Sequence, residues 1–171
     1  MALCYFDASA VVKYYVTEPG SHWLRQLVQE RDPQTNQFSN VILVAEITRV
    51  EVAAALAVIE RVGRIKKLER DREYRRFTAQ LTSRYAIVPP TTSDFATAAN
   101  LTQHHPLKAY DAMQLAVALR YRQVLASPEI TFVTSDSTLF TAAQAEGLSA
   151  DNPSNHVAPE DTYGRRMERG S

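Results

Sequence analysis

The sequence predicts one α/β domain with three layers, in which a central, mostly parallel sheet lies between two layers of helices. Three observations lead to this prediction: short apolar runs alternate with longer helical stretches, the chain has 171 residues, and 45% of them are hydrophobic. Such alternation is typical of βαβ units, whose parallel sheet is covered on both faces. The length suits a single domain with a substantial core.

Five short apolar runs are the expected strands, because their length and their aromatic and β-branched content favour buried strands. They cover residues 3–6, 41–44, 86–88, 130–134 and 148–150. Helices are expected between them, over residues 9–15, 21–30, 45–63, 64–81, 93–103, 110–122 and 137–146. Ser21 and Ser93 are the expected N-caps of two of these helices, and Gly147 suits the position just past the last one.

Composition excludes several classes of protein. Lysine and arginine number 19 and aspartate and glutamate number 19, and this balance argues against a purely electrostatic nucleic-acid or membrane binder. The single cysteine excludes a disulfide framework and a cysteine-rich zinc fold. The apolar run 52–59 is far shorter than the roughly 20 residues of a membrane span. We therefore expect a cytoplasmic protein that does not engage a membrane.

Residues 1–153 are expected to form the domain. Residues 154–171 are polar, and the stretch from Pro159 contains no large aliphatic residue except Met167. Such a composition cannot bury enough apolar surface to fold, so we expect a disordered C-terminal tail.

Four acidic residues stand at the ends of elements or in apolar surroundings. Asp7 and Asp136 follow the first and fourth expected strands, Asp111 begins a helix rich in alanine and leucine, and Glu51 lies inside an apolar helix. Sites in open α/β sheets form outside the carboxyl ends of the strands, so Asp7 and Asp136 are expected at the same edge. Singly, each acid also has a purely structural interpretation, as a helix cap, a favourable first-turn charge or half of an ion pair.

Together with their flanking residues, the acids resemble the motifs of PIN-domain ribonucleases of the VapC toxin type. The matching segments are FDASAVVKYY at residues 6–15, EITRVEVAAAL at 46–56, LKAYDAMQLA at 107–116 and FVTSD at 132–136. The resemblance covers residues 3–153 and implies a PIN-like α/β/α fold. Carried over position by position, it implies that Asp7, Glu51, Asp111 and Asp136 are catalytic, with Glu46 as a rival for Glu51.

The resemblance also implies a cofactor and a reaction. Asp7, Asp111 and Asp136 would bind Mg²⁺ or Mn²⁺, with Ser9 and Thr134 as supporting polar neighbours. Both ions prefer oxygen ligands, and a cation would relieve the repulsion among converging carboxylates. The implied reaction is hydrolysis of RNA. The implied partners are an antitoxin protein and a second copy of the chain, in a homodimer or a toxin–antitoxin assembly.

Positive charge must accompany an acidic pocket that receives RNA. Residues 61–76 carry eight basic side chains, which either contact phosphates or form ion pairs with the acids interleaved among them. Lys13 and Lys108 lie close in sequence to Asp7 and Asp111, and they are the expected RNA-binding residues. Two alternatives remain at this point: an RNA-processing nuclease that is not a toxin, and a catalytically inactive PIN-like binding module.

Overall fold

The computed structural model describes residues 2–125 and 129–163, and it contains one five-stranded parallel sheet. The strands are β1 (Leu3–Phe6), β2 (Val41–Ala45), β3 (Ala86–Val88), β4 (Ile130–Val133) and β5 (Ser149–Asp151). Their order in the sheet is β3-β2-β1-β4-β5, and every neighbouring pair is parallel. This arrangement confirms the predicted fold class, and the predicted strands agree with the observed ones to within one residue.

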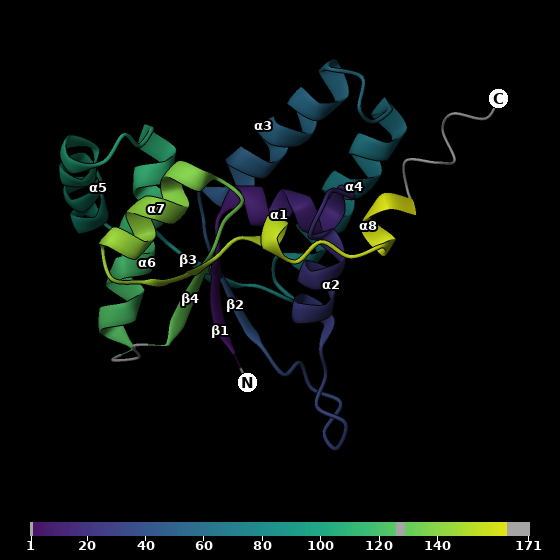
Figure 1. Cartoon of the computed structure of the whole chain (residues 1–171), viewed down its shortest axis with the longest axis horizontal. Helices are drawn as coiled ribbons and strands as arrows, with labels where there is room; N and C mark the ends of the chain where they lie inside the picture. Colours follow the sequence, from purple (N-terminus) through teal and green to yellow (C-terminus); the bar gives the residue numbers. More distant parts are fainter. Residues whose placement is uncertain (1, 126–128, 164–171) are drawn as a thin grey trace.

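Helices cover both faces of the sheet (Figure 1). One layer contains α1 (Ala8–Tyr15), α2 (Ser21–Gln29), α3 (Thr48–Arg61) and α4 (Lys67–Gln80). The other layer contains α5 (Thr92–His104), α6 (Ala109–Val124) and α7 (Ser137–Ala145). No helix within the described ranges has both the length and the apolar character needed to cross a membrane.

The alternation of side chains along β1 explains why the sheet needs two helical layers. Cys4 and Phe6 belong to the core cluster beneath α1–α4, whereas Tyr5 belongs to the cluster beneath α5–α7. All three are buried, because successive side chains of a strand point to opposite faces. The central strand is therefore apolar along its whole length, as expected for a strand buried on both sides.

The chain reverses its direction of travel across the sheet beside β1. It runs from β1 through β2 to β3 on one side, and then crosses back through α5 and α6 to place β4 on the other side. The carboxyl ends of β1 and β4 consequently flank a topological switch point, where ligands of open α/β sheets bind. The loops that follow these two strands begin at Asp7 and Thr134.

Some predicted helix boundaries were wrong, because capping depends on contacts that the sequence does not reveal. Ser21 is the first residue of α2 rather than its cap, and its hydroxyl donates to the backbone of Lys13. Thr91, not Ser93, caps α5 in a reciprocal capping box with Asp94. The third helix begins at Thr48 rather than at Ala45, which belongs to β2, and the charged helix begins at Lys67 rather than at residue 64.

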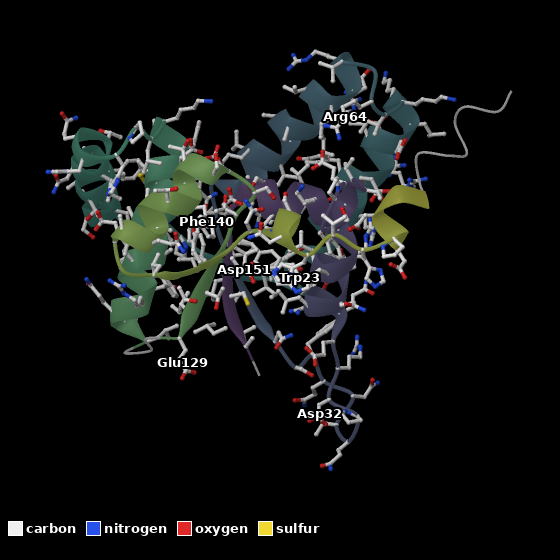
Figure 2. All side chains as sticks on the ribbon, in the orientation of Figure 1. Trp23, Asp32, Arg64, Glu129, Phe140 and Asp151 are labelled. Carbon is white, nitrogen blue, oxygen red and sulfur yellow. The ribbon has the colours of Figure 1, made fainter. Side chains whose placement is uncertain are left out.

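The first part of the expected tail is folded, contrary to the prediction of disorder. A 3₁₀ helix, η1 (Pro153–Asn155), and a short helix, α8 (Glu160–Tyr163), follow β5. Asp161 is buried and accepts hydrogen bonds from Gly20 and His22 at the start of α2, at 2.8 and 2.7 Å. The ring of His156 stacks on Trp23 at 4.2 Å between centroids and pairs with Asp151; Figure 2 labels Trp23 and Asp151. The remainder of the tail, residues 164–171, lies outside the described residues.

Candidate active site

The four predicted acids line one cleft of about 350 Å³ at the carboxyl ends of β1 and β4. Asp7 follows β1, Asp136 follows β4, Glu51 lies in the first turn of α3, and Asp111 lies in the first turn of α6. These elements are far apart in the sequence, and the parallel sheet brings their ends to the same edge. The fifth acid of the cleft wall is Glu18, which sequence reasoning did not select.

Asp7 forms the floor of the cleft and is only 5% exposed. Its carboxylate caps α1 through a 2.9 Å hydrogen bond from the backbone N–H of Ala10, and it accepts further bonds from the hydroxyls of Ser9 and Thr134. Burial raises the pKa of Asp7 to about 6, although these hydrogen bonds favour the charged form and oppose the shift. Asp7 is therefore a preorganised carboxylate that forms no ion pair with any other described residue.

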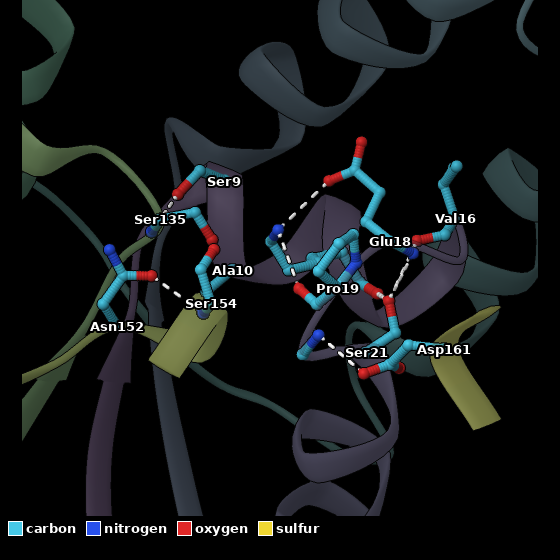
Figure 3. A network of polar contacts seen from close by, with 12 residues as sticks. Ser9, Ala10, Val16, Glu18, Pro19, Ser21, Ser135, Asn152, Ser154 and Asp161 are labelled. Atoms are coloured by element: carbon cyan, nitrogen blue, oxygen red, sulfur yellow. Dashed lines mark hydrogen bonds and ion pairs between the residues drawn. The ribbon is translucent and has the colours of Figure 1, made fainter. Parts of the chain in front are cut away.

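Ser9 and Thr134 connect the ends of β1 and β4, as the sequence led us to expect of supporting polar residues. Thr134 Oγ1 donates to Asp7 at 2.9 Å and accepts from the backbone N–H of Asp136 at 3.1 Å. Ser9 Oγ accepts from the backbone N–H of Ser135 at 2.8 Å (Figure 3). The two hydroxyls thus hold the loop after β4 against the start of α1 and fix the position of Asp136 relative to Asp7.

Glu51 is half-buried in the cleft wall, and its pKa is strongly shifted. Burial raises this pKa to about 7, with help from the charges of Asp7 and Asp111, while a hydrogen bond from Gln114 opposes the shift. The Gln114 amide donates to Glu51 Oε2 at 2.6 Å. Sequence reasoning missed Gln114, although a polar residue on the buried side of an apolar helix, three positions after Asp111, was a signal that could have identified it.

Asp111 and Asp136 both line the cleft, and their negative charges repel each other. Burial raises the pKa of Asp111, and the negative charge of Asp136 raises it further, while Lys108 has the opposite effect. Asp136 also caps α7, because its carboxylate accepts the backbone N–H of Leu139 at 2.8 Å. The capping role and the place in the cleft wall are compatible, since a carboxylate has two oxygens.

Glu46, the rival of Glu51, lies outside this constellation. It pairs with Arg49 at 2.5 Å and is not part of the cleft lining, whereas Glu51 is. The geometry therefore favours Glu51 as the acid that α3 contributes.

Comparison with known proteins identifies the fold. A family model for the PIN domain matches residues 4–143. The chain belongs to the PIN domain family. No curated protein matches the chain.

Two solved structures share this PIN fold. One is VapBC2 from Rickettsia felis, bound to a DNA fragment from its promoter: it has 15% sequence identity and a TM-score of 0.58, and the match covers 88% of this chain and 98% of that one. The other is PAE2754 from Pyrobaculum aerophilum, with 18% identity and a TM-score of 0.56 over 91% of this chain and 92% of that one. At these identities the likeness concerns the fold alone.

Lys13, one of the two expected RNA-binding residues of this PIN domain, is a structural residue instead. Its side chain is 8% exposed, and its ammonium group contacts Glu18 at 3.4 Å and the carbonyl of Pro19 at 3.1 Å. Arg64 also pairs with Glu18 (Figure 3 shows the loop around Glu18), and the two cations hold the pKa of Glu18 below its usual value despite burial. Glu18 is thus neutralised, which sets it apart from the four predicted acids. Lys108 is exposed at the N-terminus of α6 and stays available.

The basic helix α4 carries three ion-paired arginines, which fits the second of the two interpretations of residues 61–76. Arg70 pairs with Glu60 and Asp71, Arg72 with Glu69 and Glu73, and Arg76 with Glu73. Tyr14 and Tyr15 lie within 5.3 Å of the Arg76 guanidinium and belong to the core. These side chains therefore have protein partners and are not poised for phosphate.

The donor set of the cleft suits a hard divalent cation. All candidate ligands are carboxylate or hydroxyl oxygens, the donors that Mg²⁺ and Mn²⁺ prefer. Burial raises the pKa of Asp7, Glu51 and Asp111, and the charges of neighbouring carboxylates add to the shift of Glu51 and Asp111. Within residues 2–125 and 129–163, however, no three Asp, Glu, His or Cys side chains form a compact ready-made metal site. An ion held partly through water, as Mg²⁺ commonly is, fits this open arrangement.

Proposed function

We propose that this PIN domain is a metal-dependent endoribonuclease and the toxin of a type II toxin–antitoxin pair. The observation that carries the proposal is the placement of four carboxylates around one cleft at the switch point of the sheet, where none of them forms a salt bridge with another described residue. PIN domains are generally metal-dependent nucleases, so family membership supports the same class of reaction. Buried like charges are costly unless a ligand compensates them, and a cation on a phosphodiester would do so.

Each acid has an assigned task in this proposal. Asp7 and Asp111 are the main ligands of Mg²⁺ or Mn²⁺, and Asp136 completes the binding directly or through water. The bound ion supplies an activated water and neutralises charge on the phosphate. Glu51, which lines the same cleft as Asp7 and Asp111 and is held by Gln114, would take the proton of the attacking water.

The bond changes follow from an in-line displacement. The oxygen of the attacking water forms a bond to phosphorus while the bond from phosphorus to the 3′-oxygen breaks. The leaving 3′-oxygen acquires a proton from solvent, so the products are a 3′-hydroxyl and a 5′-phosphate. Ser9 and Thr134 keep Asp7 in place throughout, because their hydrogen bonds to its carboxylate fix its rotamer.

The proposal also names a substrate, RNA, and a protein partner, an antitoxin. Lys108 lies at the N-terminus of α6, where its charge acts on Asp111, and it forms no salt bridge with another described residue. We assign it to the RNA backbone. The antitoxin partner is supported by the fold shared with VapBC2, which is bound to a DNA fragment from its promoter. The antitoxin would occupy the acid cleft and would thereby exclude RNA. A homodimer, or a hetero-oligomer with the antitoxin, is the expected assembly.

A cleavage assay on single-stranded and structured RNAs tests the proposal. Wild type, Asp7→Asn and Asp111→Asn are purified identically and assayed with Mg²⁺, Mn²⁺ or EDTA. We expect cleavage by wild type only with a metal, and a loss of about a thousandfold or more in each variant, because the substitution removes a ligand charge but keeps the side-chain shape. Arg72→Gln, on the ion-paired helix, is the matched control that should cleave like wild type. Equal cleavage by all proteins, or none with either metal, would count against the nuclease.

A further inference from the structure

Gln114 is a fully buried polar side chain that connects the acid cleft to the core. It is 1% exposed and lies on α6 between Met113 and Leu115, which are both buried. Its Nε2 donates to Glu51 Oε2 at 2.6 Å and to Thr48 Oγ1 at 2.9 Å, so both amide N–H groups have acceptors. Its Oε1 accepts from the hydroxyl of Tyr5 at 2.7 Å. A buried amide with this many partners has one orientation that satisfies them all.

The partners on either side fix that orientation. An ionised carboxylate only accepts hydrogen bonds, so the amide nitrogen must face Glu51 and the oxygen must face Tyr5. Tyr5 cannot swing away, because its ring is fully buried and stacks on Phe132 with centroids 5.4 Å apart and planes at 11°. A reversed amide would present its oxygen to the carboxylate oxygen of Glu51, and that contact would be lost, whereas the Tyr5 hydroxyl can either donate or accept.

We propose that Gln114 is a positioning residue for Glu51, oriented in turn by the hydroxyl of Tyr5. Gln114 holds Oε2 of Glu51, which leaves Oε1, without a hydrogen-bond partner among the described residues, to face the attacking water. The inference rests on the proposed nuclease function of the same cleft and adds a residue that acts through Glu51. Gln114 links α6 to β1 through Tyr5 and to α3 through Glu51. Asp111 lies on the same helix α6, and Asp7 directly follows β1.

Steady-state kinetics on RNA test the proposal through Gln114→Leu and Tyr5→Phe. We expect kcat to fall roughly ten- to a hundredfold in Gln114→Leu, the range typical of residues that orient a functional side chain, and less in Tyr5→Phe. KM should stay within about twofold, because neither residue faces the substrate. The matched control is Tyr85→Phe, which removes a buried hydroxyl bonded to Tyr15 at 3.2 Å away from the cleft and should leave kcat unchanged. A fall in kcat as large in the control as in Tyr5→Phe would overturn the proposal.

A double-mutant cycle separates positioning from general damage. In the Glu51→Gln background, Gln114→Leu should lower kcat by less than about twofold, because a residue that acts through Glu51 has nothing left to position. If the two losses multiply, Gln114 does not act through Glu51.

Nuclear magnetic resonance supplies a readout that does not depend on activity. The side-chain amide protons of Gln114 should exchange slowly with water, and their resonances should shift in Glu51→Gln and in Tyr5→Phe but not in Tyr85→Phe. Unshifted resonances would overturn the proposal even if the enzyme cleaves RNA. If wild type cleaves no RNA, the nuclease fails on its own, while these resonances still decide whether Gln114 holds Glu51.

Discussion

The acid cleft and helix α4 are both densely charged, but they handle their charges in opposite ways. In the cleft, Asp7, Glu51, Asp111 and Asp136 share one wall without a salt bridge among the described residues. On α4, Arg70, Arg72 and Arg76 all pair with neighbouring acids. Surface pairs contribute little to stability and carry no ligand preference, whereas unpaired, buried like charges are unfavourable until a counter-ion arrives.

The comparison shows that charge density alone does not reveal a site. Both regions stand out in the sequence, and the basic one is the more conspicuous, with eight cations within residues 61–76. The distinguishing property is whether the fold supplies a charge with a partner, as it does for Arg64, Arg70, Arg72 and Arg76 of that segment. Glu18 makes the same point inside the cleft, since it lines the wall but is neutralised by Lys13 and Arg64.

The largest expected effect concerns the stability of the metal-free cleft. The pKa values of Asp7 and Glu51 in the folded state, about 6 and about 7, lie above their unfolded values, so the folded protein binds more protons in between. The free energy of unfolding should therefore fall as pH rises from about 4 to about 7, with a contribution of about 3 kcal/mol from Asp7. Mg²⁺ or Mn²⁺ should restore stability at pH 7.5 and do little at pH 5, where protons compete.

Thermal or urea unfolding across this pH range, with metal or EDTA, measures the effect. The control is the double variant Asp7→Asn, Glu51→Gln, which should lose both the pH slope and most of the metal response. If wild type and the double variant show the same dependence of stability on pH, the cleft does not carry unpaired charges.

A smaller effect is expected from Lys13→Met, which keeps the aliphatic stem but removes the ammonium group. Glu18 and the carbonyl of Pro19 each lose a partner, so the free energy of unfolding should fall by about 1–3 kcal/mol. The KM for RNA should remain within about twofold, because the side chain is buried. Urea unfolding and steady-state kinetics check both parts. A variant of wild-type stability with a tenfold higher KM would restore Lys13 as an RNA contact.

The smallest expected effect is a difference in the KM for RNA between variants of two cations, Lys108 near the cleft and Arg72 on α4. Lys108→Gln should raise KM severalfold and reduce the slope of log KM against log salt by about one, as the loss of one phosphate contact does. Arg72→Gln removes another exposed cation, one that is paired with Glu69 and Glu73, and KM should change by less than about twofold. Equal responses of the two variants would remove the distinction between paired and available cations.

The sequence predicted the sheet well because the signals of buried strands are local. Residues 86–88, for example, are apolar, short and followed by two prolines, and they form β3 within those bounds. Caps were less predictable: Ser21 and Ser93 have the right chemistry, but Gly20 and Thr91 occupy the cap positions. The preference of a serine for a cap is small, and tertiary contacts such as the one from Asp161 to the start of α2 outweigh it.

The sequence by itself predicted the α/β class, since the short apolar runs of buried strands are local, and the resemblance of four short motifs to PIN domains pointed to the four acids. Only the tertiary structure decided which charges stay unpaired. Glu18 meets Arg64 across 46 positions, Gln114 meets Glu51 across 63, and Tyr5 meets Gln114 across 109. Such contacts depend on the crossovers of the whole fold, because the parallel order of the strands brings these distant residues together.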